Sequence, residues 1–333
     1  MIRLRDLVPG LALLALASAV QAAPSGYHLA DRLPGPDGGW DYPAYDSVHD
    51  RVLVSRPSAV TVFDLKTRTV LPALAPAVRG HAALSVNDGK EIAITNGGDG
   101  TTSFVDSGSG ALLAQVKVGE GPDAATFDPR TGQLLVMNHK GGDVSLLDPK
   151  AHRLVATIPV GGVLEAAAVD GRGMAYVNIE DRNEIAVLDL TAHKVLRRYP
   201  LPGCDGPTGI IFANEGRLLV SSCDRVAMVV RADTGEVVRR LPIGAGADGV
   251  AYDPVRHRVL IPAGRDGTLS VIALAKDDAA VIDTITTRKG ARTLTLDPAT
   301  GRVFLPTADY LPGVEGGRPV PKPGTFELLI ISP

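Results

Sequence analysis

Short apolar runs alternate with Gly, Pro and Asp clusters along nearly the whole chain. The clearest stretch is residues 123–162, whose apolar runs are 124–127, 133–138, 144–147 and 154–160. Runs of β-branched and aliphatic residues between turn-forming residues are typical of antiparallel strands joined by hairpins. The stretch therefore predicts a four-stranded sheet, which needs similar neighbours because it cannot bury both of its faces alone.

The same unit recurs along the chain. An Asp closes the first apolar run in five units, and an Asn takes its place in two others: Asp46, Asn87, Asp128, Asp170, Asn214, Asp253 and Asp297. The step from first to last spans six repeats of about 42 residues, which is the period of a four-stranded propeller blade.

The seventh unit is divided between the two ends of the chain. Residues 292–333 supply three strands, and residues 27–35 have the pattern of the missing fourth strand. Pairing the first and last strands in one blade closes the ring and leaves no free edge. We predict an all-β fold, a single seven-bladed β-propeller domain over residues 23–333, closed by the N-terminal strand completing the last blade.

Three in-phase motifs carry a resemblance to a known family. GPDAATFDPRTGQLLVMN, VSLLDPKAHRLVATIPVG and IAVLDLTAHKVL are similar to repeats of the YVTN-type, YncE-like seven-bladed β-propellers. The resemblance spans residues 27–332, although the namesake tetrapeptide survives only loosely, as LVMN, YVNI and LVSS. It implies the architecture and says little about activity.

The first 22 residues have the pattern of a secretory signal peptide. Arg3 and Arg5 precede the apolar run 11–20, and Val20-Gln21-Ala22 offers small residues for cleavage. A buried N-terminal helix is the alternative. We expect a periplasmic or secreted protein that is not membrane-spanning, because no later run reaches transmembrane length.

Charge and motifs exclude several function classes. The formal net charge is −3 and no dense Lys/Arg tract occurs, so we expect no nucleic acid partner. The common signatures of hydrolases, metalloproteases and nucleotide-binding loops are absent. We expect a monomer whose partner is a small molecule or another protein.

The repeat also predicts a ring of side chains at the mouth of the central channel. Counting five residues back from each anchor gives Asp41, Ala82, Asp123, Glu165, Gly209, Asp248 and Arg292, with His81 and Thr208 just before two of them. Carboxylates that converge need a cation, shared protons or water. One interpretation is a site for a cationic ligand or a divalent metal ion, held by Asp123, Glu165, Asp248 and His81.

The other interpretation of the ring is structural, with each Asp capping a turn and facing channel water. Arg292 weakens the metal interpretation, because it could neutralise a neighbouring carboxylate directly. His139, in the following loop, is a further candidate for ligand binding or proton transfer. His152, His193 and His257 fall in turns on the opposite face, where we expect solvated surface residues.

One loop on the channel face is unusually long. It runs from Pro306 to Gly324 and is rich in Pro and Gly, which is typical of lids, binding loops or structureless excursions. Its candidate contacts are Asp309, Tyr310, Arg318 and Lys322.

Cys204 and Cys223 fall on one face of one blade, and export would place them in an oxidising compartment. A disulfide is therefore predicted. A Cys/His copper site is the alternative, although no Met or His stands at a convincing ligand spacing.

The leading hypothesis is a non-enzymatic exported propeller that binds a small ligand, a metal ion or a protein partner at the loops of the channel face. The alternative is a metal-assisted hydrolase or lyase, similar to propeller lactonases, with its site on the axis. Propellers can assemble such sites from single residues on different blades, so the missing motifs do not exclude it.

Overall fold

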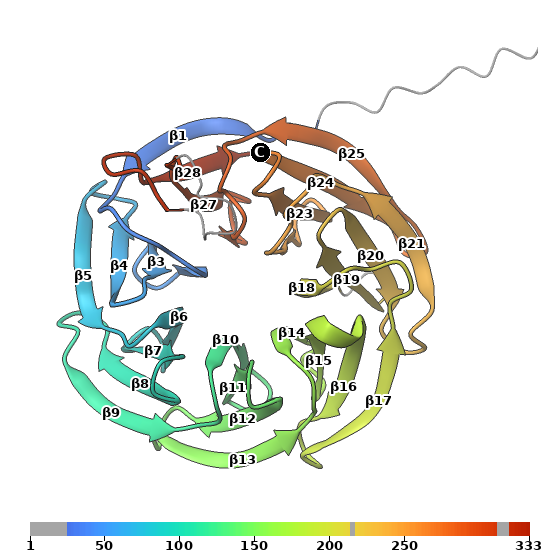
Figure 1. Cartoon of the computed structure of the whole chain (residues 1–333), viewed down its shortest axis with the longest axis horizontal. Helices are drawn as coiled ribbons and strands as arrows, with labels where there is room; N and C mark the ends of the chain where they lie inside the picture. Colours follow the sequence, from blue (N-terminus) through green and yellow to red (C-terminus); the bar gives the residue numbers. More distant parts are fainter. Residues whose placement is uncertain (1–24, 214–216, 312–319) are drawn as a thin grey trace, which may run out of the picture.

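The computed structural model describes residues 25–213, 217–311 and 320–333. Seven four-stranded antiparallel sheets stand around a central channel, as Figure 1 shows. The predicted seven-bladed β-propeller is therefore confirmed. The predicted signal peptide, the anchor Asn214 and the loop residue Arg318 lie outside the described residues.

The strands of the first three blades run in chain order from the channel outward. They are β2 (Pro43–Asp46), β3 (Arg51–Ser55), β4 (Ala59–Asp64) and β5 (Val70–Pro76); β6 (Gly80–Val86), β7 (Glu91–Asn96), β8 (Thr101–Asp106) and β9 (Leu112–Lys117); and β10 (Pro122–Asp128), β11 (Gln133–Asn138), β12 (Asp143–Asp148) and β13 (Arg153–Pro159).

Blades four to six follow the same order. They are β14 (Leu164–Val169), β15 (Met174–Ile179), β16 (Glu184–Asp189) and β17 (Lys194–Pro200); β18 (Pro207–Ala213), β19 (Leu218–Cys223), β20 (Val226–Arg231) and β21 (Val237–Pro242); and β22 (Ala251–Asp253), β23 (Arg258–Ala263), β24 (Thr268–Leu274) and β25 (Ala279–Thr286).

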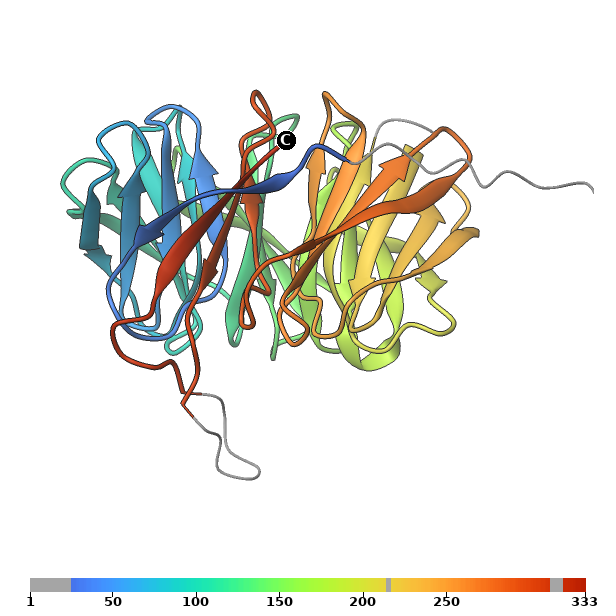
Figure 2. The ribbon, with the colours of Figure 1, turned by 90° about the horizontal axis from the view of Figure 1, so that it is seen from above.

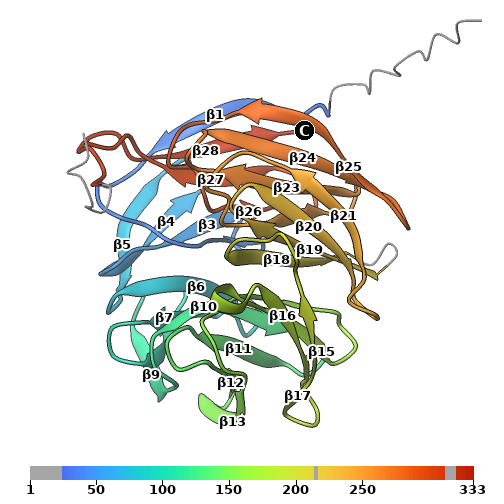
Figure 3. The same ribbon diagram turned by 45° about the vertical axis from the view of Figure 1, so that its right-hand side comes forward.

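The seventh blade joins the two ends of the chain. It holds β26 (Thr295–Leu296), β27 (Val303–Thr307), β28 (Glu327–Ser332) and, outermost, β1 (His28–Pro34). β1 is antiparallel to β28, from the pair His28 and Ser332 to the pair Pro34 and Glu327. Figures 1 and 3 show the two strands side by side. The predicted closure by the N-terminal strand is confirmed.

The core lies between the blades. Second and third strands are buried almost throughout, as in β11, whose last five residues are all buried. One apolar cluster joins residues of β10–β12 to residues of β14–β16, and similar clusters join other neighbouring blades. Each sheet thus covers a face of the next one, as expected for sheets too small to bury both faces alone.

The recurrent Asp is a turn residue. Asp128 and Asp253 are fully buried, and each lies at the end of a first strand. The Asp253 carboxylate accepts hydrogen bonds from the backbone amides of Val255 and Arg256, at 2.9 and 3.0 Å. This contact closes the hairpin to the second strand in the manner of an Asx-turn.

The predicted disulfide is confirmed, because Cys204 and Cys223 are bonded with their Cα atoms 5.3 Å apart. It joins the loop before β18 to the end of β19. The copper interpretation is wrong, since neither sulfur remains a free thiolate.

Helix is nearly absent. The described residues form one short 3-10 helix, η1 (Glu180–Arg182), and within them no helix is long and apolar enough to cross a membrane.

The described ends of the long loop lie together on one face of the propeller, seen edge-on in Figure 2. The Leu311 amide donates to the Val320 carbonyl at 2.9 Å, and the Lys322 amide donates to the Asp309 carbonyl at 2.7 Å. The Asp309 carboxylate also pairs with Arg288 at 2.6 Å. The described base of this loop is therefore an ordered hairpin, and its role as a lid stays a prediction.

Closure of the ring should carry a measurable part of the stability. Leu33 of β1 is 3% exposed and packs between the seventh and first blades. We expect Leu33→Ala to lower the free energy of unfolding by about 2–4 kcal/mol, from lost burial and the cavity left behind. Urea unfolding of the protein measures this.

Leu71→Ala is the matched control, because Leu71 lies on the outermost strand of the first blade and is 47% exposed. This control should change the free energy by about 0.5 kcal/mol or less. Equal effects of the two substitutions would contradict the role given to β1.

Candidate functional site

The charged ring residues converge on the channel mouth. Asp123 and Glu165 each occupy the second position of a first strand, and Asp41, Asp248 and Arg292 lie just before one. Their side chains are only 12 to 35% exposed. The shared start of the first strands places them there, because all of these strands enter from the same face. Of the remaining ring positions, Ala82 is buried and Gly209 contributes only backbone, its amide donating to the Asp248 carbonyl at 2.7 Å.

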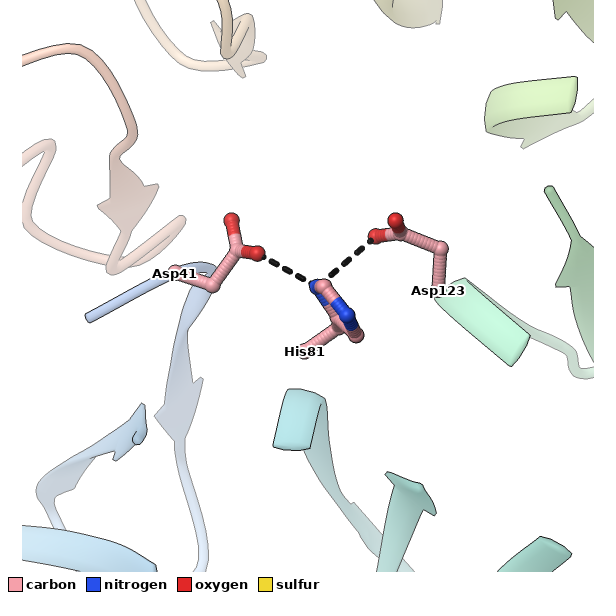
Figure 4. Close-up of side chains that lie close together, drawn as sticks. All are labelled: Asp41, His81 and Asp123. Carbon is pink, nitrogen blue, oxygen red and sulfur yellow. Dashed lines mark hydrogen bonds and ion pairs between the residues drawn. The ribbon is translucent and has the colours of Figure 1, made fainter. Parts of the chain in front are cut away.

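Three of these blades meet at His81. Its Nδ1 atom lies 2.7 Å from an Asp41 oxygen and 3.6 Å from an Asp123 oxygen, as drawn in Figure 4. A carboxylate oxygen accepts hydrogen bonds, so Nδ1 carries a hydrogen in this arrangement. The opposite edge of the imidazole faces Gly97, where an added Cβ would lie 2.8 Å from Nε2. The missing side chain at Gly97 therefore leaves space for the imidazole in the orientation that points Nδ1 at the two carboxylates.

Burial and mutual charge raise the pKa values in this group. Burial alone would lower the pKa of His81, but the hydrogen bond with Asp41 and the negative charges of Asp123 and Asp41 outweigh it and raise the pKa. Burial also raises the pKa of Asp123 to about 7, with further increases from Asp41 and Glu165 and an opposing effect from His81. The group therefore holds protons that it can exchange near neutral pH.

A second group lies beside the first. His139 Nδ1 is 3.1 Å from both a Glu165 oxygen and the Leu164 carbonyl oxygen. Glu180, from η1, completes the group. The hydrogen bond to Glu165 raises the pKa of His139 to about 9 against the opposing effect of burial. Burial and the charge of Glu165 raise the pKa of Glu180.

Asp248 has a different partner. Its carboxylate lies 3.0 Å from Nε of Arg292, which also reaches Asp41 at 3.5 Å. Burial raises the pKa of Asp248 to about 7, although Arg292 opposes this effect. The direct neutralisation expected for Arg292 is therefore present.

The metal ligands expected from the sequence do not form one set. His81 and Asp123 group with Asp41, Glu165 groups with His139 and Glu180, and Asp248 pairs with Arg292. Counting positions along a repeat gives each residue's height on the axis but not its nearest partner, because side-chain length and direction decide the pairing.

Tyr42 was missed by the sequence analysis. It follows Asp41, contacts the apolar cluster of the third and fourth blades, and places its hydroxyl 3.5 Å from Glu165 across the channel. Burial and four surrounding carboxylates raise its pKa well above the usual value.

Past Tyr42 the channel continues as an apolar cavity of about 140 Å³. A signal was present, because the corresponding positions of other blades hold small or aliphatic residues: Ala83, Ala124, Ala166, Ile210, Gly249 and Thr293.

One histidine on the opposite face differs from expectation. His152 is not a solvated surface residue, because its Nε2 lies 2.7 Å from Glu91 and its ring packs on Phe104 with centroids 4.9 Å apart. Glu91 and Phe104 belong to the neighbouring blade, so this histidine links two blades.

The geometry at the mouth suits a positively charged ligand. Five carboxylates face the mouth: Asp41, Asp123, Glu165, Glu180 and Asp248. Among the described residues their basic partners at the mouth are Arg292, His81 and His139. Burial raises the pKa values of Asp123 and Asp248, and repulsion from the neighbouring carboxylates raises them further. A bound cation would stabilise the charged form of both groups.

No family model matches the sequence, and no curated protein matches it either. Solved structures do match. A chain of the "Crystal Structure of Mitotic Checkpoint Complex" aligns with a TM-score of 0.74 at 16% identity, covering 100% of this chain and 99% of that one. A chain of Kuenenia stuttgartiensis hydrazine synthase aligns with a TM-score of 0.70 at 15% identity, covering 85% and 95%. At such identities the likeness shows the fold alone.

The His139–Glu165 pair should make stability depend on pH. The pKa of His139 is about 9 in the folded protein and about 6.5 in the unfolded chain. The pair therefore contributes its full stabilisation of the folded state below the unfolded pKa. The contribution is lost as the pH rises through 9. We expect His139→Gln to lower the free energy of unfolding by roughly 1–2 kcal/mol at pH 6, allowing for partial exposure of the pair, and to leave it almost unchanged at pH 10. Urea unfolding at the two pH values measures this difference.

His28→Gln serves as the control, because the His28 ring is exposed on β1 and hydrogen-bonds to the nearby Gly26 carbonyl at 3.0 Å, with no carboxylate partner among the described residues. A His139→Gln cost that is the same at both pH values would show that the charged pair is not its cause.

Proposed function

We propose that this protein is an exported binding propeller of the YncE-like type, and that it binds a divalent transition metal ion at the channel mouth through Asp41, His81 and Asp123. The observation that carries the proposal is the position of His81 Nδ1 between two carboxylates from neighbouring blades. The general role of a binding scaffold agrees with rigid loops around a channel.

The spacing of the three groups is close to that of a metal site. Ligand atoms around tetrahedral zinc lie about 3.3 Å apart, given metal–ligand distances near 2.0 Å. The two distances from His81 Nδ1, 2.7 and 3.6 Å, bracket this value. Side-chain shifts of less than about 1 Å would therefore admit the ion.

The donor set favours a transition metal over calcium. One imidazole nitrogen and two carboxylate oxygens suit zinc and its neighbours, whereas calcium prefers six or more oxygens. Two carboxylates also balance a double positive charge. The metal would replace the hydrogen on Nδ1, so affinity should increase as the pH rises. Arg292 lies 3.5 Å from the other side of the Asp41 carboxylate, and this ion pair would keep Asp41 oriented toward the metal ion.

Two observations support export and the family assignment. The disulfide agrees with an oxidising compartment. The in-phase motifs of the third and fourth blades resemble YncE-like repeats and occupy the strands that such repeats form.

A metal-assisted hydrolase or lyase is the second candidate. Three protein ligands leave a coordination position open, as in catalytic zinc sites. Asp248, with a pKa of about 7, stands near the site and could exchange a proton. Zinc-loaded protein would then cleave lactones or esters, and Asp248→Asn would remove this activity but keep the metal. A binding protein would show no turnover.

The proposal predicts stoichiometric metal binding. We expect calorimetry on the mature protein to give one zinc ion bound per chain, and His81→Ala to weaken this binding at least about tenfold by removing a ligand. His28→Ala, on the outer strand β1, should leave it unchanged, and thermal melts should show that both variants are folded.

Binding that survives His81→Ala at full strength would move the site elsewhere. Failure of zinc, cobalt and nickel to bind the wild-type protein would contradict the proposal.

A further inference from the structure

A second hollow lies next to the acidic mouth, between the sixth and seventh blades. It is a cavity of about 360 Å³, and its lining includes Gly264, Arg265, Lys289, Gly290, Arg292 and Tyr310. Its chemistry is opposite to that of the mouth, because its lining residues include two arginines and a lysine and no Asp or Glu. Only Arg292 belongs to both.

Two glycines make one wall of this pocket flat. An added Cβ at Gly264 would lie 2.8 Å from the Arg292 Cβ, and one at Gly290 would lie 2.7 Å from the Tyr310 ring. Side chains at these positions would therefore collide with the arginine and the tyrosine. The missing side chains let the Tyr310 ring lie against the backbone, so the pocket has an aromatic surface beside a smooth wall.

Tyr310 is held in place from behind. Its ring stacks on Trp40 with centroids 6.2 Å apart and planes inclined by 29°. Trp40 in turn packs edge-on against Phe326, at 5.2 Å. The aromatic surface of the pocket is therefore supported by the core between the seventh and first blades, and a ligand would not have to order it.

The three cationic residues of the pocket differ in whether they have a carboxylate partner. Arg292 is paired with Asp248 and Asp41, and Arg265 is paired with Asp224. Lys289 is exposed and has no ion pair with any residue in the described ranges. The nearby Asp266 carboxylate already accepts a hydrogen bond from the Ala245 amide. The pocket therefore has an excess of positive charge, concentrated at Lys289.

We propose that this pocket binds a planar organic anion, such as an aromatic carboxylate. Its ring would lie against Tyr310 and the glycine wall, and its carboxylate would face Lys289 and Arg265. A flat, mostly carbon-lined surface favours a ring over a bare inorganic anion, and the cations select negative charge. The site goes beyond the metal site proposed above and does not require it, because its lining contains no metal-ligating group.

The test uses the whole propeller, residues 23–333, in the presence of EDTA, so that metal binding is absent by design. Benzoate is the probe, and ligand-observed NMR measures its affinity beside those of benzamide, cyclohexanecarboxylate and inorganic phosphate. We expect benzoate to bind most tightly. Lys289→Met should weaken benzoate roughly tenfold through loss of a charge-assisted contact, and Tyr310→Leu should remove the preference for benzoate over cyclohexanecarboxylate.

Lys140→Met is the matched control, since Lys140 is an exposed lysine in another glycine-rich groove of the propeller. It should leave benzoate affinity unchanged. Equal binding of benzamide and benzoate, an unchanged affinity in Lys289→Met, or tighter binding of phosphate would each overturn the proposal. Because no metal is present, none of these results bears on the zinc site, and a failed zinc titration leaves this test standing.

Discussion

The pairing of β1 with β28 is the contact on which the rest of the structure depends. Each blade covers a face of its neighbour, so an open ring would expose the apolar faces of the first and seventh blades. The mouth also crosses this seam. The Thr293 hydroxyl donates to the Asp41 carbonyl at 3.0 Å, and the Tyr45 amide donates to the Thr295 hydroxyl at 3.0 Å. Closure therefore sets the distance between Arg292 and Asp41, and with it the charge balance of the site.

The closed ring concentrates charge that isolated blades would not bring together. Asp41 comes from the first blade, His81 from the second, Asp123 from the third and Arg292 from the seventh. Each is half-buried, so water screens it weakly and its neighbours determine its proton affinity. The mouth divides into a histidine–carboxylate side, a tyrosine bridge across the channel and an arginine side that opens into the basic pocket. This separation places the proposed cation site and the proposed anion site side by side on one face.

The periodicity of the sequence was sufficient to predict the seven-bladed propeller. In five blades the first run ends in an Asp, such as Asp128 or Asp253, and these residues are spaced by the blade repeat because their buried carboxylates close the hairpins to the second strands. The disulfide followed from placing both cysteines on one face of one blade. The residues at the mouth were also found, since their height on the axis depends on the repeat alone.

Pairings within the mouth could not be obtained in this way. Whether Asp123 meets His81 or Glu165 depends on side-chain directions set by neighbours such as Gly97, which a repeat does not encode. Tyr42 carries no formal charge and is therefore not among the predicted ring residues, although most of the corresponding positions in other blades hold smaller side chains. His152 was assigned to solvent from its turn position, but its carboxylate partner, Glu91, lies 61 positions earlier in the sequence, on the preceding blade.

The central claim is that His81 Nδ1 and the two flanking carboxylates form a metal site. A crystal structure of the protein soaked in zinc, with data collected on both sides of the zinc absorption edge, tests it most directly. We expect one strong anomalous peak within about 2.2 Å of His81 Nδ1 and of one oxygen each from Asp41 and Asp123. An empty mouth at saturating zinc, or a peak bound only by other residues, would contradict it.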